Sequence, residues 1–366
     1  MRIVYVLTTL AIGGAERQAV ALAERMSARG HSVALIVLRP RVVEQWPTEL
    51  PVVYLNLRKS PVSLLAALAS ARKFLAGFHP DLIHSHAFHA NIFARLLNGL
   101  APPQVVSSVH NIYEGGWLRM TAYRLTDAFS VKTTAVCQAA VDRYVRLRAV
   151  PRSKCIVMAN GIDPEEFTPS LERGERLRAQ MGASGNFIWL AAARLSTAKD
   201  FPNLLRAFAL VRVQAAGACL FIAGQATIAQ ASAMQALTAE LGLEDSVRWL
   251  GLRHDLPALL DAADAFVLAS AWEGMPLVVA EAMAMQKPVV VTDAGGTREL
   301  VGECGAIVPP KNPQALADAM LATMLGSAKA RGALGRAARQ RILESFSIRA
   351  RASEWEALYR SLTPSN

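Results

Sequence analysis

The chain has 366 residues, of which 52% are hydrophobic and 19% charged. It exceeds the size at which one hydrophobic core stops growing, so two domains are expected, and its apolar content excludes a disordered protein. The net charge of +10 is concentrated in one half, since residues 1–160 carry 19 Lys and Arg against 8 Asp and Glu, whereas residues 161–366 carry 20 against 21. A partner that recognises positive charge is therefore expected on the N-terminal half.

Anionic lipid headgroups, a phosphorylated acceptor and nucleic acid are the candidate partners for this charge. Nucleic acid is the least favoured, because no binding motif or stacking pattern of aromatic residues accompanies the basic residues. The four cysteines form no Cys-x-x-Cys pair, which favours free thiols in a reducing cytosol. The first apolar run has only the length of a strand, and no stretch approaches 18 apolar residues without a charge or a break. Neither a signal peptide nor a membrane-spanning helix is therefore expected.

The first half opens with a strand, a glycine turn and a helix. Residues 1–10 form an apolar run, Gly13-Gly14 a turn, and residues 15–29 an amphipathic pattern, with a second strand at 32–38. This order predicts a βαβ unit whose turn lies where a phosphate-binding loop would be, although the full G-x-G-x-x-G pattern is absent. The strands expected next are 51–57, 81–86, 105–109 and 155–158, and the helices are 64–78 and 117–129.

Histidines lie at or just after the ends of two of these strands. His84, His86 and His89 suggest a metal site, but no acidic or cysteine ligand lies near them in the sequence, so we favour a strand end that faces an interdomain cleft. His110 directly follows the strand at 105–109, and open α/β sheets place ligand contacts at such carboxyl ends. A histidine that is hydrogen-bonded at a loop corner is the alternative.

The expected helix at 117–129 is basic and carries aromatic residues. Trp117, Met120, Tyr123 and Arg124 recur at helical spacing, and further Arg and Lys residues follow up to Lys154. This composition is compatible with a helix that lies on a membrane surface. A solvated helix face packed on its own domain is the alternative.

The clearest break in the chain is Asn160-Gly161-Ile162-Asp163-Pro164, where the charge balance also changes. After a polar segment around 170–186 the alternation of strands and helices restarts, which predicts a parallel, doubly wound sheet. The strands expected are 187–193, 219–223, 247–250, 265–269, 288–292 and 306–308. The helices expected are 201–213, 231–241, 256–262, one that starts at Pro276, and further helices to the end of the chain.

The stretch Trp272–Met283 carries two acidic residues around the start of a helix. Pro276 suits the first helical position, because it has no N–H to leave unbonded and its φ already fits a helix. Glu273 then lies in the preceding loop and Glu281 inside the helix, with the open N–H groups of the first turn between them. Two hydroxyl-binding carboxylates around an anion site suit a sugar nucleotide. The alternative is that Glu273 only interacts favourably with the helix dipole and Glu281 is an ordinary solvated residue of the helix.

Two cations follow the first strand of the second half. Arg194 and Lys199 lie where side chains enter the ligand site of such a sheet. An Arg fork and a Lys point charge can clamp a diphosphate. Ordinary surface charge is the alternative.

Together and in this order, the motifs resemble the family 4 retaining glycosyltransferases of the GT-B type over nearly the whole chain. The matching stretches are Gly13-Gly-Ala-Glu16, His110, Asn160-Gly-Ile-Asp163, Arg194 with Lys199, Gly251-Leu-Arg253, Glu273-Gly-Met-Pro with Glu281, and Gly295-Gly296. The resemblance implies two Rossmann-like doubly wound α/β domains that face a cleft, with a C-terminal helix crossing back to the N-terminal domain. Residues 1–163 with about 346–366 would form the acceptor domain, and residues 164–345 the nucleotide-sugar donor domain.

The same resemblance implies roles for individual residues. Glu281 looks like the ribose ligand, and Glu273 like the carboxylate that holds hydroxyls of the donor sugar. Arg194 and Lys199 resemble a diphosphate clamp, and His110 resembles the histidine that contacts the donor sugar. Catalytic roles are thus implied at Glu273, His110, Arg194 and Lys199. Further donor contacts are implied at Gly13, Gly14, Arg253, Gly274, Met275, Pro276 and Leu277.

The implied activity is retaining transfer of a sugar from a nucleotide-sugar, by default a UDP-sugar, to a hydroxyl of a glycan or lipid-linked glycan in cell-envelope polysaccharide biosynthesis. No Asp-x-Asp metal motif is present, so we expect neither a metal nor another cofactor. Where many members have Gly-Asp-Gly-Pro, this chain has Gly224-Gln-Ala-Thr227, which leaves the nucleotide preference open. A sugar-nucleotide epimerase of the same shape and a non-catalytic sugar-nucleotide binding protein are the alternatives. The basic N-terminal half suggests a cytoplasmic protein at the inner membrane face.

Overall fold

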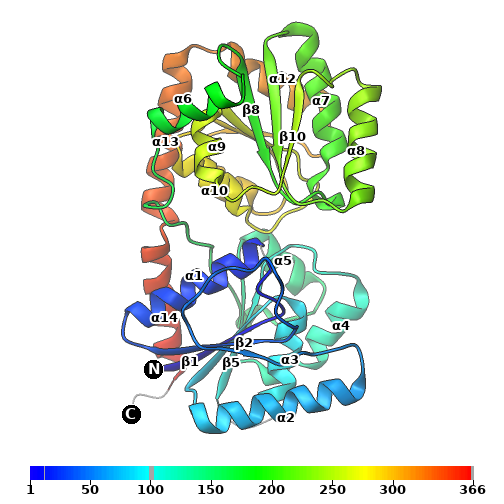
Figure 1. Ribbon diagram of the computed structural model, residues 1–366. Helices are drawn as coiled ribbons and strands as arrows, with labels where there is room; N and C mark the ends of the chain where they lie inside the picture. Colours follow the sequence, from blue (N-terminus) through cyan, green and yellow to red (C-terminus); the bar gives the residue numbers. More distant parts are fainter. Residues whose placement is uncertain (12, 99–102, 364–366) are drawn as a thin grey trace. The chain divides into compact units, whose positions relative to one another are not determined.

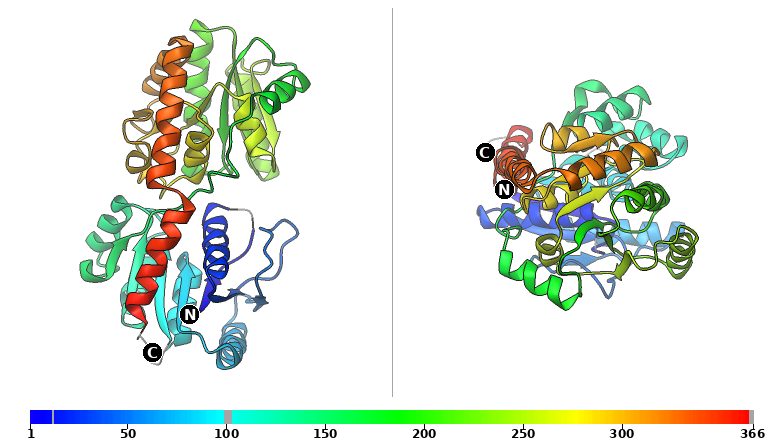
Figure 2. Two further views of the ribbon diagram at one scale, coloured as in Figure 1. Left: turned by 90° about the vertical axis from the view of Figure 1, so that its left-hand side faces the viewer. Right: turned by 90° about the horizontal axis from the view of Figure 1, so that it is seen from above.

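The structure is a computed structural model that describes residues 1–11, 13–98 and 103–363. The chain divides into two compact units, which we call unit 1 (Met1–Gly161 with Ile348–Asn366) and unit 2 (Ile162–Ser347). Each unit is a parallel sheet with helices on both faces (Figure 1 and Figure 2). The chain passes between the units at 161/162 and 347/348, whereas the sequence placed these points at 163/164 and 345/346.

Unit 1 contains a seven-stranded sheet in the order β3-β2-β1-β4-β5-β6-β7. Alternate residues of β1 point to opposite faces, so Tyr5 lies in a core with α1 and α14, whereas Val4 and Val6 lie in a core with α2 and α3. Because both faces are buried, the strands are nearly continuous apolar runs. The strands are β1 (Arg2–Leu7), β2 (Ser32–Val37), β3 (Val52–Tyr54), β4 (Leu82–His86), β5 (Gln104–Val109), β6 (Lys132–Ala135) and β7 (Cys155–Val157). The helices are α1 (Gly14–Ala28), α2 (Pro61–Phe78), α3 (Phe88–Asn98), α4 (Trp117–Leu125), α5 (Gln138–Arg146) and α14 (Ile348–Leu362).

Unit 2 contains a six-stranded parallel sheet in the order β10-β9-β8-β11-β12-β13. Its main core joins alternate residues of the central strands to α7 and α12, with Trp189 and Phe208 fully buried. The strands are β8 (Phe187–Ala192), β9 (Ala218–Ala223), β10 (Val247–Gly251), β11 (Ala265–Leu268), β12 (Val289–Thr292) and β13 (Ala306–Val308). The helices are α6 (Leu171–Gln180), α7 (Phe201–Gln214), α8 (Ile228–Glu240), α9 (Leu256–Ala262), α10 (Leu277–Ala284), α11 (Thr297–Val301), α12 (Pro313–Leu325) and α13 (Ala328–Ser345).

The structure contains elements that the sequence patterns did not predict. The segment around 170–186, read as a polar connection, contains α6, whose only buried residue is Gly174 and whose start is capped by the Ser170 hydroxyl. The helix expected at 117–129 ends at Leu125 and is followed by a 3₁₀ turn at Asp127–Phe129. The other unpredicted elements are β6, α3, α5 and α11.

The C-terminal helix α14 belongs to unit 1. Trp355 and Tyr359 lie in the same core as α1 and β1. The Tyr359 hydroxyl lies 2.6 Å from His84 Nδ1 and 3.1 Å from the Tyr5 hydroxyl. The expected return of the C-terminal helix to the N-terminal domain is therefore confirmed.

Helix α2 differs from the sequence expectation about membrane spans. It has 18 residues with a mean hydropathy of 1.2, which by length and composition alone suffices to cross a membrane, and only 11% of it is buried. The sequence predicted no spanning helix, because no stretch approaches 18 apolar residues without a charge or a break, and α2 itself contains Arg72 and Lys73. In unit 1 the buried side of α2, with Ala67, Leu68 and Ala71, packs in the core that also contains residues of α3.

Candidate functional site

The loops at the carboxyl ends of the unit 2 strands are joined to one another by backbone hydrogen bonds. The Ala271 N–H donates to the Ala198 carbonyl over 2.8 Å, which ties the loop after β11 to the loop after β8. The Gly296 N–H donates to the Gly274 carbonyl over 2.7 Å, which ties in the turn after β12. The loops after β8, β11 and β12 are therefore connected at this edge of the sheet, where open α/β sheets bind ligands.

Glu273 is a buried acidic residue of this edge. It lies in the loop after β11 and is 6% exposed. Its Oε1 atom pairs with the Lys199 ammonium and accepts a hydrogen bond of 2.6 Å from the Ser270 hydroxyl. Burial of a carboxylate requires such partners, since an unpaired buried charge is strongly destabilising. The sequence predicted Glu273 and Lys199 separately, and the structure brings them together.

Glu281 occupies the other predicted position of the motif. It lies inside α10, as expected, and is 3% exposed. The backbone of α10 therefore fixes the position of the Glu281 carboxylate, whereas Glu273 lies in the loop that precedes this helix.

The start of α10 differs by one residue from the sequence prediction. Pro276 was expected at the first helical position, but its ψ of 105° is extended, and it is the N-cap of a helix that begins at Leu277. The Pro276 carbonyl accepts from the N–H groups of Val279 and Ala280, at 3.1 and 3.4 Å. Among the described backbone hydrogen bonds none is donated by Leu277 or Val278, so their N–H groups are the open donors of this helix. The predicted contacts Gly274, Met275 and Leu277 thus surround an N-terminus that suits an anion.

The two predicted cations lie in the loop after β8. Arg194 is the second residue after the strand, and Lys199 ends a 3₁₀ turn, Thr197–Lys199. Asp200 follows with a left-handed backbone, at φ 44°, and caps α7. Gly224 at the end of β9 packs against this loop so closely that a Cβ atom there would lie 1.8 Å from the Ala193 carbonyl oxygen. A glycine is therefore required at the first position of the unusual Gly-Gln-Ala-Thr loop.

Arg253 has a partner of its own. Its guanidinium makes two hydrogen bonds to Asp255, at 2.7 and 2.5 Å, in the turn after β10. These bonds raise the pKa of Arg253 and lower the pKa of Asp255. The carboxylate therefore holds the predicted base-contacting side chain within its own turn.

In unit 1, the predicted glycine pair lies between β1 and α1. Gly13 is the N-cap of α1, and Gly14 is its first residue. The Gly13 carbonyl accepts from the Arg17 N–H at 3.0 Å and from the Trp46 indole at 3.1 Å. These bonds fix the turn at the carboxyl end of β1.

His110 forms a pair with His86 on the neighbouring strand. His86 Nδ1 and His110 Nε2 are 2.9 Å apart, while His86 Nε2 and His110 Nδ1 are buried with no hydrogen-bond partner among the described residues. Burial lowers the pKa of His110 to about 4 and lowers that of His86 well below its usual value. The pair is therefore neutral at pH 7, and sequence reasoning did not detect it.

The three histidines considered for a metal do not converge. His84 is fully buried, where it contacts Tyr359 and the Ser108 hydroxyl, so its ring belongs to the core of unit 1. His89 lies on α3 and is exposed. Among the described residues, no group of three His, Cys, Asp or Glu side chains forms a metal site.

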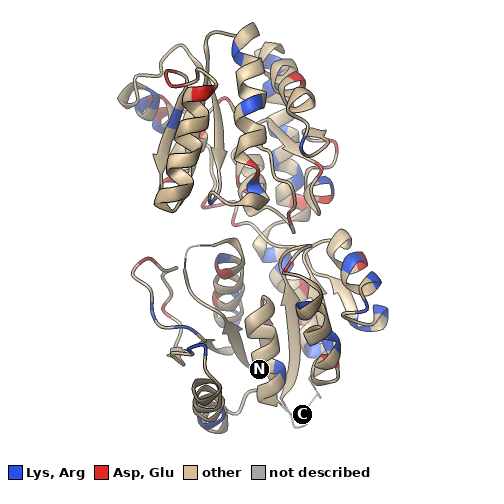
Figure 3. Cartoon of the chain, turned by 90° about the vertical axis from the view of Figure 1, so that its right-hand side faces the viewer, with Lys and Arg blue, Asp and Glu red and all other residues tan. Residues whose placement is uncertain are grey.

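Helix α4 presents apolar and basic side chains to solvent. Trp117, Leu118 and Leu125 are 75%, 66% and 74% exposed, whereas Met120 and Tyr123 are buried. The aromatic set predicted from the sequence is thus divided between the two sides of the helix. Arg124 lies on the exposed side, and unit 1 carries the excess of Lys and Arg (Figure 3).

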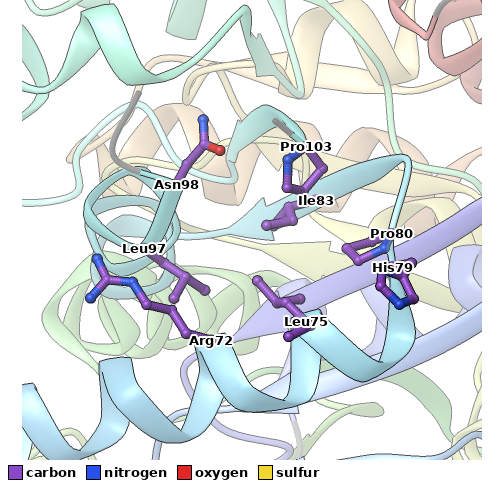
Figure 4. A pocket seen from close by; sticks show the side chains of 9 residues that line it. Arg72, Leu75, His79, Pro80, Ile83, Leu97, Asn98 and Pro103 are labelled. Atoms are coloured by element: carbon purple, nitrogen blue, oxygen red, sulfur yellow. The ribbon is translucent and has the colours of Figure 1, made fainter. Parts of the chain in front are cut away.

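A pocket of about 470 Å³ lies away from the predicted residues of unit 1. Its lining includes Arg72, Leu75, His79, Pro80, Ile83 and Leu97 (Figure 4). His79 and Pro80 come before β4, so this pocket is at the amino end of that strand, whereas His110 follows the carboxyl end of β5. It therefore contains none of the predicted site residues.

Two family models together match most of the chain. Residues 186–325 match the model described as glycosyl transferases group 1, and residues 12–166 match glycosyltransferase family 4. A D-inositol 3-phosphate glycosyltransferase from Corynebacterium urealyticum is 30% identical over 338 residues, which cover 84% of this chain and 78% of that protein. The UDP-Gal:alpha-D-GlcNAc-diphosphoundecaprenol alpha-1,3-galactosyltransferase of Escherichia coli is 28% identical over 248 residues, which cover 65% of this chain and 64% of that protein.

Solved structures show the same fold over the whole chain. A crystal structure of HepE from Anabaena in complex with UDP and glucose has a TM-score of 0.87 and is 22% identical, covering 99% of this chain and 100% of that one. Sucrose-phosphate synthase from Thermosynechococcus elongatus has a TM-score of 0.85 and is 21% identical, covering 99% of each chain. At these identities the likeness establishes the arrangement of strands and helices, and the chemistry has to be argued from the residues.

Proposed function

The chain belongs to the glycosyltransferases of family 4, and we propose that it transfers a sugar from a nucleotide-sugar to a hydroxyl of a glycan or lipid-linked glycan, with retention of the anomeric configuration. The observation that carries this proposal is the pair of Glu273 and Lys199 directly before the start of α10. It puts a hydroxyl-binding carboxylate beside a cation and open backbone donors. A sugar diphosphate needs this set of groups.

The proposed donor is a UDP-sugar, used in cell-envelope polysaccharide biosynthesis. The E. coli relative is named for UDP-Gal and for a diphosphoundecaprenol-linked sugar, and HepE was solved with UDP and with UDP-glucose. In this proposal Glu281 binds the ribose, Glu273 binds hydroxyls of the sugar, and the turn containing Arg253 contacts the base.

In the proposed reaction, the bond between the anomeric carbon and the β-phosphate oxygen breaks, and its electrons leave with the nucleoside diphosphate. The acceptor hydroxyl attacks from the same face, and its proton passes to the departing phosphate oxygen. The charge that develops there is stabilised by Arg194, Lys199 and the N–H groups of Leu277 and Val278, with no metal ion. Preorganised donors of this kind are usually the largest contribution to catalysis.

Residues of unit 1 are proposed to contact the donor sugar as well. Gly13 and Gly14 form a turn without side chains at the end of β1, which lets a ligand approach the backbone. His110, with its pKa lowered to about 4, exchanges hydrogen bonds as a neutral ring at pH 7. It therefore adds no positive charge next to the sugar.

The exposed side of α4 is the proposed contact with the cytoplasmic leaflet of a membrane. Trp117, Leu118 and Leu125 supply apolar side chains, and the basic excess of unit 1 supplies attraction to anionic headgroups. A lipid-linked acceptor is presented at such a surface. The protein is accordingly proposed to be cytoplasmic and peripheral to the membrane, with no role in nucleic-acid binding.

A panel of UDP-, GDP- and ADP-sugars in a thermal-shift assay tests the donor class. A ligand at 100 times its dissociation constant stabilises the folded protein by about 2.7 kcal/mol, so a UDP-sugar should raise the Tm clearly above the other nucleotides. Transfer to an acceptor is then followed by NMR, with and without EDTA, and the anomeric coupling of the product reports retention.

The alternatives give different results in the same assays. A sugar-nucleotide epimerase would convert the donor in the absence of any acceptor and release a rearranged sugar nucleotide. A binding protein would show the thermal shift with no turnover at all. Inversion at the anomeric carbon or loss of activity in EDTA would refute the retaining, metal-independent part of the proposal.

A further inference from the structure

The two hydrogen-bond donors on Glu273 share one oxygen. The Lys199 ammonium and the Ser270 hydroxyl both bind Oε1, the latter at 2.6 Å. Oε2 has no partner among the described residues, and it is not among the fully buried unpaired atoms, so it reaches solvent. The carboxylate is thus held on one side and open on the other.

We propose that Ser270 is a positioning residue that fixes Glu273 so that only Oε2 meets the hydroxyls of the donor sugar. This proposal rests on the proposed function, because it concerns the ligand of the same site. Two donors on one oxygen fix the rotation of the carboxylate, which would otherwise present either oxygen. The ligand then meets a single acceptor whose position is set before binding.

Ser270 is itself held from the neighbouring strand. It is 1% exposed and is the second residue after β11. Its carbonyl accepts a hydrogen bond of 2.6 Å from the hydroxyl of Thr292, the last residue of β12, which is also 1% exposed. Thr292 therefore fixes the Ser270 backbone, and the Ser270 hydroxyl in turn fixes Glu273.

The same arrangement lets Lys199 bind Glu273 and a diphosphate at the same time. An ammonium group has three N–H donors and Glu273 uses one of them, so two remain for phosphate oxygens. The Ala271 N–H, bonded at 2.8 Å to the Ala198 carbonyl, holds the loop of Ser270 against the loop of Lys199. Lys199 can therefore join the carboxylate to a diphosphate without leaving Glu273.

The test compares Ser270→Ala and Ser270→Cys with the wild type in the full chain. Loss of a hydrogen bond to a charged group corresponds to a roughly 10- to 100-fold change, so we expect kcat for the UDP-sugar to fall by that factor in Ser270→Ala. The Cys variant keeps the shape with a weaker donor, and its kcat should lie between the two. The Kd of UDP alone, measured by calorimetry, should stay within about twofold, because UDP lacks the donor sugar whose hydroxyls Oε2 is proposed to bind.

Ser246→Ala is the matched control. Ser246 is a buried serine of unit 2 whose hydroxyl donates to the Leu243 carbonyl at 3.2 Å, and it lies before β10, at the opposite edge of the sheet. It should change neither kcat nor the Kd of UDP. Thr292→Val should lower kcat in the same direction as Ser270→Ala, and Thr292→Ser should restore it. The effects of Ser270→Ala and Thr292→Val should not add in the double variant.

Two results would overturn the positioning role. One is turnover by Ser270→Ala within twofold of the wild type. The other is a parallel loss of UDP affinity, Tm and kcat, which marks Ser270 as a structural residue. The proposed function and this role both fail if the wild type turns over no UDP-, GDP- or ADP-sugar and binds none of them more tightly than the corresponding nucleotide. This role alone fails if the wild type is active and Ser270→Ala has the same activity.

Discussion

His84 and His86 are buried in unit 1 and His110 is half-buried, and each has a lowered pKa because removal from water disfavours the charged ring. The unfolded chain therefore binds protons near pH 6.5, whereas these histidines stay neutral in the folded protein until the pH is lower. Their contribution to the free energy of unfolding is fully present above pH 6.5 and is lost as the pH falls from 6.5 towards 4.

We expect the free energy of unfolding to fall between pH 7 and pH 5, by roughly 2 kcal/mol from His110 alone. Urea unfolding at a series of pH values measures this slope. His110→Asn, which cannot be protonated, should show a shallower slope. A variant and a wild type with the same dependence on pH would contradict the assignment.

Glu273 and Glu281 should differ in what they control. In Glu273→Gln we expect kcat to fall by ~10²-fold or more with the Kd of UDP nearly unchanged, since this carboxylate acts on the sugar. In Glu281→Gln we expect the Kd of UDP to rise by roughly 10-fold or more, since a hydrogen bond from the ribose to a charged group is weakened.

Calorimetry with UDP and steady-state kinetics with the UDP-sugar separate these two effects. Exchanged phenotypes would reverse the two assignments. Equal losses in both quantities for both variants would show that the two acids act as one structural unit.

Sequence reasoning identified the charged residues of the unit 2 site but not the residues that hold them. Glu273, Lys199 and Glu281 were found because two acidic residues surround a helix start and a cation follows a strand, in a pattern that resembles a known family. Ser270 and Thr292 were missed, because a serine or a threonine in a loop fits many structures. Only the fold brings the Ser270 hydroxyl to Glu273 and the Thr292 hydroxyl to the Ser270 carbonyl.

At the scale of elements, the strands were predictable because most are buried on both faces and appear as apolar runs. Helix α6 was not, since its sequence, LERGERLRAQ, offers no apolar stripe, and its one buried residue is a glycine packed on the Asp261 carbonyl. The start of α10 was misplaced by one residue, because the ψ of Pro276 depends on the loop before it and a proline suits either position.

Helix α14 stabilises unit 1 through its apolar side. In Trp355→Ala we expect a loss of about 3–5 kcal/mol in the free energy of unfolding, because the indole is buried beside the His84 ring. Trp117→Ala, at a residue that is 75% exposed, is the control and should change stability by less than about 0.5 kcal/mol. Denaturant unfolding measures both, and equal effects would mean that α14 contributes little to the core.

At the scale of the whole molecule, the excess of Lys and Arg in the first half predicts a salt-dependent attraction to anionic surfaces. We expect the protein to sediment with vesicles rich in phosphatidylglycerol at about 50 mM salt, and to be released at about 500 mM, where charges are screened within a few ångströms. Vesicles of phosphatidylcholine alone should retain little of it.

A double variant locates this contact. Trp117→Ala with Leu118→Ala removes exposed apolar side chains of α4 and should weaken vesicle binding. The matched control is Val213→Ala with Ile228→Ala, at two residues of unit 2 that are 85% and 89% exposed, and it should bind as the wild type does. If both double variants bind equally well, α4 is not the membrane contact.

The place of α14 in unit 1 also affects how the protein is made. The helix that covers Tyr5 and His84 is encoded after all 186 residues of unit 2, from Ile162 to Ser347. At a synthesis rate of ~5–20 residues per second, the ribosome needs roughly 10–40 s to make unit 2, and during this time the apolar residues of unit 1 that pack against α14 are exposed. Unit 2 is continuous in sequence and can complete its fold first. The N-terminal unit is therefore the last to be finished, and its open face is the surface on which we expect a chaperone to act during synthesis.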